Sequence, residues 1–287
     1  GMVSRWIRYH LCGGNFPSKH KLPNGTHIPI GKLPTRHHAL SVMVFNLAVL
    51  ATYAFLSSIL DERIAFLAVL LFVAHPLGVQ CIAWPSGLGY PLTLFWMMLS
   101  FNLLHWFYSL PTFSAWEACF TIFTFLVLQF LSINALFIAM MQFPILLFFG
   151  WWPFAILSMI ISLFMGLNIV KTTIDFRAKA FKDQNMGSST HFKPRKFIIA
   201  LKTLWYYYKS TIFPKRMGLY HEWGFHYNES VEREDRMFWF GLLATIGLAF
   251  AFFTKGFEVQ FSILWFCSFI FIFLNWVTIQ QFTTERY

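Results

Sequence analysis

Long apolar runs alternate with short polar or proline-rich segments along most of the chain. The runs lie at 39–60, 64–74, 90–110, 116–132, 134–149, 153–170, 237–253 and 259–277. About 20 apolar residues suffice to cross the hydrocarbon core of a bilayer as an α-helix. Together with a more amphipathic segment at 197–213, these runs predict an all-α, polytopic integral membrane protein with about eight or nine transmembrane helices.

The polar segments divide the chain into four parts. Residues 1–38 form a polar, basic arm, 39–170 a transmembrane bundle, 171–196 a basic loop, and 197–287 a C-terminal membrane region with a polar loop at 214–236. The segment 197–213 carries Lys202 and Lys209, so it is either a short span or an interfacial helix.

Two local signals place helix boundaries inside the bundle. Asp61, Glu62 and Arg63 predict a tight polar turn between the first two runs. Pro76 disfavours the helical conformation at His75, so the second helix should stop or kink there.

The composition indicates that most of the chain is surrounded by lipid rather than by water. Hydrophobic residues make up 57% of the chain and charged residues 12%, whereas soluble domains carry about 25% charged residues. The net charge of +10 comes from residues in loops between the apolar runs. Binding to anionic lipid headgroups explains this charge, and nucleic acid is not an expected partner.

Neither a metal nor a cofactor is predicted. Cys12, Cys81, Cys119 and Cys267 are isolated and show no zinc-site or disulfide spacing. His75 and His105 both lie near predicted spans and could together ligate a haem, but no second pair or haem motif supports this. The favoured role of His75 is a hydrogen bond at the end of its helix.

The basic segments also predict an orientation. The positive-inside rule places both 1–38 and 171–196 on the cytoplasmic side of the membrane. Six predicted spans lie between them, and an even number of crossings returns the chain to the side where it began.

Residues 36–104 contain a recognisable arrangement of residues. His38 and Asn46 lie on the first predicted helix, and the second ends in His75 and Pro76, followed by Trp84. Ser86 and Gly87 come next, before another span. This arrangement resembles the membrane half of the transmembrane-and-TPR O-mannosyltransferases and their bacterial relatives, which belong to the GT-C superfamily of polyprenyl-phosphate-sugar glycosyltransferases.

The resemblance implies a GT-C-like fold, and it places the N-terminal arm on the side opposite to the one that the positive-inside rule gives. It also points to His75, Pro76, Gln80, Trp84 and Gly87 as the motif positions. The segment 203–225 is similar to the family's aromatic helix that ends at a proline-containing loop.

The chain departs from the family at every charged motif position. The family's second His is Gly78 here, its Glu is Gln80, its Arg is Leu88 and its Asp is Tyr90. The family's first helix and the acidic residue that follows it are also expected to be absent, because no acid precedes Asp61 and no predicted helix precedes residue 39.

These departures bear directly on catalysis. Sugar transfer from a lipid phosphate needs a base near the acceptor and cations or a metal at the leaving phosphate. Gln80 cannot take a proton at neutral pH, and Leu88 cannot pair with a phosphate. The sequence therefore favours a non-catalytic membrane subunit that scaffolds or encloses a larger membrane protein complex. The alternative is a glycosyltransferase that moves a sugar from a polyprenyl-phosphate donor to a protein or glycan.

Two further sites have competing interpretations. Glu117, inside the fourth run, is either a functional intramembrane acid or a residue that reaches the headgroups. His221 and Glu222 in the polar loop could hold a sugar or a metal, or could belong to a solvated loop with ion pairs to Lys215 and Arg216. The expected partners are membrane lipids and other membrane subunits, in a bacterial inner membrane or an equivalent energy-transducing or secretory membrane.

Overall fold

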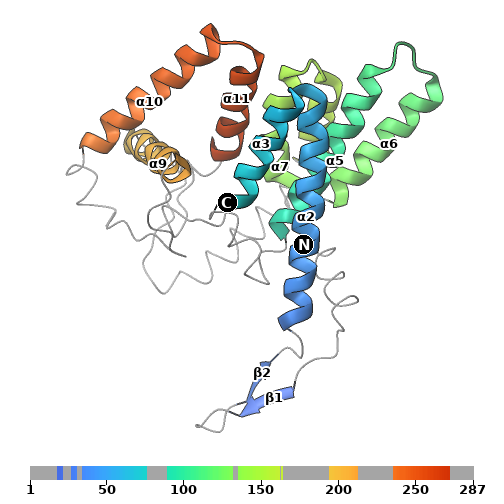
Figure 1. Cartoon of the computed structure of the whole chain (residues 1–287), viewed down its shortest axis with the longest axis horizontal. Coiled ribbons are helices and arrows are strands. Elements are labelled where there is room, and N and C mark those ends of the chain that lie inside the picture. Colours follow the sequence, from blue (N-terminus) through green and yellow to red (C-terminus); the bar gives the residue numbers. More distant parts are fainter. Residues whose placement is uncertain are drawn as a thin grey trace. The chain divides into compact units, whose positions relative to one another are not determined.

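The structure is a computed structural model of the whole chain, and the elements of its described part are helices apart from one small hairpin (Figure 1). It describes residues 18–21, 27–30, 34–75, 89–131, 135–161, 163, 194–212 and 235–271. Its elements are β1 (Ser18–Lys21), β2 (His27–Ile30), α2 (Pro34–Ile59), α3 (Glu62–Ala74), α5 (Gly89–Ser109), α6 (Ala115–Leu131), α7 (Ala135–Phe148), α9 (Pro194–Ile212), α10 (Asp235–Thr254) and α11 (Phe257–Phe271). A further short helix spans Trp152–Ile161.

Every apolar run that the sequence predicts to be helical contains a helix in the structure. The first begins earlier than predicted, at Pro34, because proline fits the first turn of a helix, where its missing N–H is not needed. The predicted turn is confirmed: Asp61 caps α3, and its Oδ1 accepts a hydrogen bond from the Arg63 N–H at 2.9 Å. Among the described residues, the hairpin β1–β2 is the one departure from the predicted all-α fold, and it lies in the polar, basic arm at 1–38.

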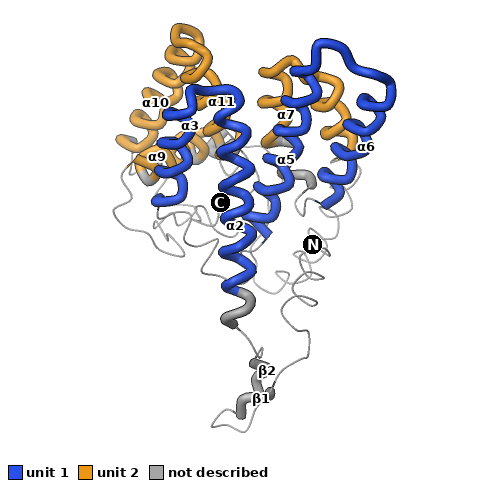
Figure 2. Tube along the Cα trace, turned by 45° about the vertical axis from the view of Figure 1, so that its right-hand side comes forward, with its two compact units in different colours: residues 1–134 blue, residues 135–287 orange. Residues whose placement is uncertain are grey.

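The chain divides into two compact units, residues 1–134 and 135–287 (Figure 2). In the first unit, α2 and α5 lie side by side and run in the same direction. Leu40 and Val44, early in α2, pack with Leu92, early in α5. Further along, the rings of Phe55 and Phe101 lie 5.2 Å apart. The tight turn at 60–61 returns the chain along α3, so α3 is antiparallel to both.

Within the second unit, α9 and α10 come into close contact. Gly241 of α10 lies so near α9 that a Cβ atom added there would be 2.2 Å from the Leu201 carbonyl oxygen. Beside it, the rings of Trp205 and Phe240 stack at 5.0 Å. In Figure 1, α9 is seen nearly end-on while α10 lies across the view, so the two helices cross steeply.

A further contact in this unit joins α7 to α11 through aromatic rings. Phe148 stacks on Phe257 at 5.4 Å, and Phe149 meets Phe261 edge-on at 5.9 Å. The chain leaves α7 through Gly150, whose φ of 73° lies in the left-handed region that favours glycine. The N–H of Trp151 then donates to the Leu146 carbonyl at 2.8 Å, which closes the end of the helix.

Among the described residues, two helices are long and apolar enough to cross a membrane, by length and composition alone. They are His38–Ile59 and Arg236–Thr254. The helices Ala115–Leu131 and Trp152–Ile161 are apolar but shorter, and α3 has 13 residues, against the roughly 20 that a crossing needs. The coarse prediction of helices suited to a membrane is supported, and the number of crossings stays a prediction.

Candidate functional site

The motif that resembles the glycosyltransferase family begins where α3 ends. His75 has an extended backbone, with φ −72° and ψ 126°, and its N–H donates to the Phe72 carbonyl at 3.4 Å. This confirms the predicted helix end, because the residue before a proline is driven out of the helical region. The side chain of His75 is half-buried.

The rest of the motif lies mostly outside the described residues. Pro76, Gln80, Trp84 and Gly87 all fall in the segment 76–88, and the loop candidates His221 and Glu222 fall in 213–234. The next described residues are Gly89 and Tyr90, at the start of α5. An undescribed segment therefore separates α3 from α5, and both the resemblance and the placement of the motif's central residues stay predictions.

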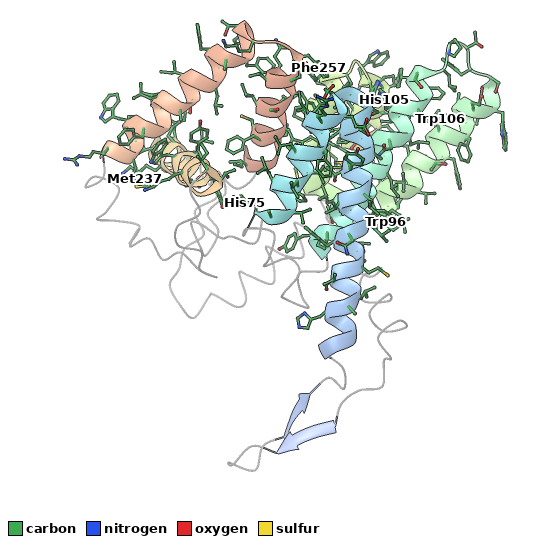
Figure 3. The ribbon with its side chains drawn as sticks, viewed as in Figure 1. His75, Trp96, His105, Trp106, Met237 and Phe257 are labelled. Atoms are coloured by element: carbon green, nitrogen blue, oxygen red, sulfur yellow. The ribbon has the colours of Figure 1, made fainter. Side chains whose placement is uncertain are left out.

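The structure separates the two histidines considered as haem ligands. His75 ends α3, and because α3 is antiparallel to α5, it lies at the level where α5 begins. His105 lies further along α5, about 24 Å from Gly89 at the helical rise of 1.5 Å per residue. Figure 3 shows the two histidines at different heights in the first unit. They do not form a ligand pair.

The structure gives Glu117 a local structural role. It lies in the first turn of α6, and its Oε2 accepts hydrogen bonds from the Ser114 N–H at 2.7 Å and the Ser114 Oγ at 2.8 Å. The Glu117 N–H donates back to the Ser114 Oγ at 3.3 Å. This reciprocal pair is a capping box. The Ser-x-x-Glu spacing was visible in the sequence, and it explains the acid without an intramembrane function.

We expect the Ser114→Ala substitution to lower the free energy of unfolding by about 1 kcal/mol, because it removes both hydroxyl-mediated bonds at the start of α6. Hydrogen exchange of the amides at 115–118 should become faster. Ser109→Ala is the matched control, since the Ser109 hydroxyl only donates to the Trp106 carbonyl within α5. Equal effects of the two substitutions would contradict the capping role.

Three polar side chains that the sequence did not single out lie inside the apolar helices. The Asn102 Nδ2 donates to the Ala51 carbonyl of α2 at 2.9 Å and to the Met98 carbonyl of its own helix at 2.8 Å. Gln142 of α7 donates to the Ser158 hydroxyl, and both are fully buried. Bonds between helices of this kind fix which helices pack together in an apolar surrounding.

Lys202 of α9 is the most unusual buried residue, with 1% of its surface exposed. A lysine inside a folded chain is costly unless it is compensated. The sequence placed Lys202 in an amphipathic segment but gave no sign that it would be enclosed, because the spacing of Lys202 and Lys209 also suits an exposed polar face.

The described residues contain no candidate metal centre. No group of three or more His, Cys, Asp or Glu side chains in the described part of the chain is placed to hold a metal. Comparison of the sequence with protein-family models, with curated proteins and with solved structures finds no match.

Proposed function

We propose that the chain is a non-catalytic, multi-pass subunit of a larger membrane protein complex, built on a degenerate glycosyltransferase-like bundle. One observation carries the proposal. Large apolar side chains are exposed along whole helices, and on α10 alone they include Trp239, Leu243, Ile246, Phe250 and Phe253. Water is a poor solvent for such a surface, whereas lipid tails or the helices of a neighbouring subunit cover it at no cost.

The short helix α3 supports the same proposal. Along it, Ile64, Phe66, Leu67, Leu70 and Leu71 are at least half exposed. A helix of this length in a soluble protein is normally part of a buried core. Its exposed apolar surface is better explained by contact with lipid or with another membrane helix.

The lost charges of the motif support a role without catalysis. Gln80 and Leu88 stand where the family carries a carboxylate and a guanidinium, so the motif lacks the base and the phosphate-binding cation that sugar transfer needs. Glu117, which lies inside the fourth predicted run, is hydrogen-bonded to Ser114 in the capping box.

The test is purification of the chain from its native membrane in a mild detergent. We expect it to migrate with one or more other membrane proteins at a fixed ratio that survives a second separation by native electrophoresis. A chain that runs alone would contradict the proposal.

The glycosyltransferase alternative rests on the helix that ends at His75 and the new helix that begins at Gly89, the layout that the motif requires. Incubation with labelled polyprenyl-phosphate sugars decides it. Transfer to any acceptor would replace the proposal. In that case Glu222→Gln should abolish transfer, while Glu229→Gln, a matched change in the same loop, should preserve it.

A further inference from the structure

The hairpin β1–β2 has one basic face. The strands are antiparallel, with Lys21 opposite His27 and Lys19 opposite Pro29. Alternate residues along a strand lie on the same face, and directly paired residues share it. Lys19, Lys21 and His27 are therefore positions on one face of the hairpin. The other face holds Ser18, His20, Ile28 and Ile30.

No acid in the same part of the chain compensates these cations. Residues 1–60 contain no Asp or Glu, and the first acid is Asp61, beyond the far end of α2. The cations of this part are Arg5, Arg8, Lys19, Lys21, Lys32 and Arg36. Clusters of four to eight cations beside a membrane-spanning helix are typical of segments that bind anionic lipids.

The chain length between the hairpin and α2 holds the basic face close to the membrane. β2 ends at Ile30 and α2 begins at Pro34, so the two points are at most about 14 Å apart even with the link fully extended. The apolar part of α2 begins at His38, about 6 Å inside the helix. The headgroup layer on each side of a bilayer is about 5–8 Å deep. The hairpin thus lies within reach of the lipid phosphates.

The opposite end of the first unit carries acids. Since α2 and α5 run in the same direction, the turn at 60–61 and the loop at 110–114 lie at the same end of this unit. Asp61 and Glu62 are exposed there, Glu117 lies in the first turn of α6 at the same end, and Arg63 is the cation. The unit is therefore basic at one end of its helices and acidic at the other.

We propose that the basic face of the hairpin β1–β2 binds the phosphate headgroups of anionic lipids in the leaflet where α2 begins. The inference rests on the proposed function, because it takes α2 as a spanning helix. It also selects between the two orientations that the sequence left open. The basic end lies on the cytoplasmic or equivalent side, as the positive-inside rule requires.

The experiment uses the full chain in lipid nanodiscs and measures hydrogen exchange of a peptide that covers 18–30. One set of discs contains phosphatidylcholine alone, and in the other phosphatidylglycerol replaces about a third of the lipid. We expect slower exchange in the anionic discs and loss of the difference at high salt. Each cation near an anionic surface strengthens binding roughly fivefold. The double substitution Lys19→Gln and Lys21→Gln should therefore weaken the contact roughly 30-fold and restore the exchange rate seen in phosphatidylcholine.

Arg63→Gln is the matched control, because it removes a cation from the opposite end of α2 and should leave the protection intact. Equal exchange in both kinds of disc would overturn the proposal. Protection of the 18–30 peptide that survives the double substitution would also overturn it. Loss of that protection in Arg63→Gln would overturn it as well. These outcomes are distinct from failure of the proposed function. That failure would be seen when the chain copurifies with no partner, whatever the lipid.

Discussion

The substitution Phe101→Ala is expected to lower the free energy of unfolding in detergent by about 3 kcal/mol. Phe101 and Phe55 are both completely buried, and their rings form the central contact between α2 and α5. Removing one ring leaves a cavity that two parallel helices cannot close without losing the neighbouring hydrogen bond from Asn102 to Ala51. Because lipid is as apolar as the core, we expect the lower end of the range seen for such substitutions.

Phe123→Ala is the control for this prediction. Phe123 is the same residue type in a helix of the same unit, but 67% of its surface is exposed. Its removal leaves no internal cavity, so the change should stay within about 0.5 kcal/mol. Denaturant titration of the purified chain, followed by circular dichroism, measures both variants. Similar losses in the two would show that Phe55 and Phe101 do not form the core of the first unit.

The second large effect is expected from Gly241→Ala in α10. The added Cβ would meet the Leu201 carbonyl oxygen at 2.2 Å and its carbon at 2.7 Å, both backbone atoms that cannot rotate away. α9 and α10 must then separate, and the stacking of Trp205 on Phe240 is lost with the contact. Overpacking of this kind costs about 2 kcal/mol.

Gly247→Ala provides a control on the same helix. A Cβ at Gly247 meets nothing within 4 Å, and alanine is the better helix former by about 1 kcal/mol. We expect a midpoint of thermal unfolding in detergent that is lower for Gly241→Ala and unchanged or higher for Gly247→Ala. Identical behaviour of the two variants would contradict the close crossing of α9 and α10.

Most helix positions could be predicted from the sequence, because a long apolar run leaves few alternatives. The ends of α3 were also predictable, since Asp61 and Pro76 act on the backbone through local chemistry that needs no tertiary contact. The hairpin β1–β2 was missed because its strands, at Ser18–Lys21 and His27–Ile30, have four residues each. Pro29 also lies within β2, and a proline weakens the strand signal of a sequence because it cannot donate to a neighbouring strand.

The interior contacts were harder to predict, because they depend on which helices become neighbours. Nothing local to Asn102 says that it will donate to Ala51, 51 positions earlier in the chain. The paired tryptophans after α7 show the same limit. Indole rings suit a membrane interface, yet Trp151 is 4% exposed and only Trp152, at 61%, is accessible. Glu117 could have been explained from the sequence, since the capping box is a local pattern.

The lipid-facing character of the helices is tested most directly by removing detergent from the purified chain. The exposed apolar surfaces of α3 and α10 predict that it aggregates in plain buffer and stays monodisperse when the same exchange is made into lipid nanodiscs. Sedimentation velocity measures both. A single, stable monomer in buffer without detergent or lipid would contradict the account.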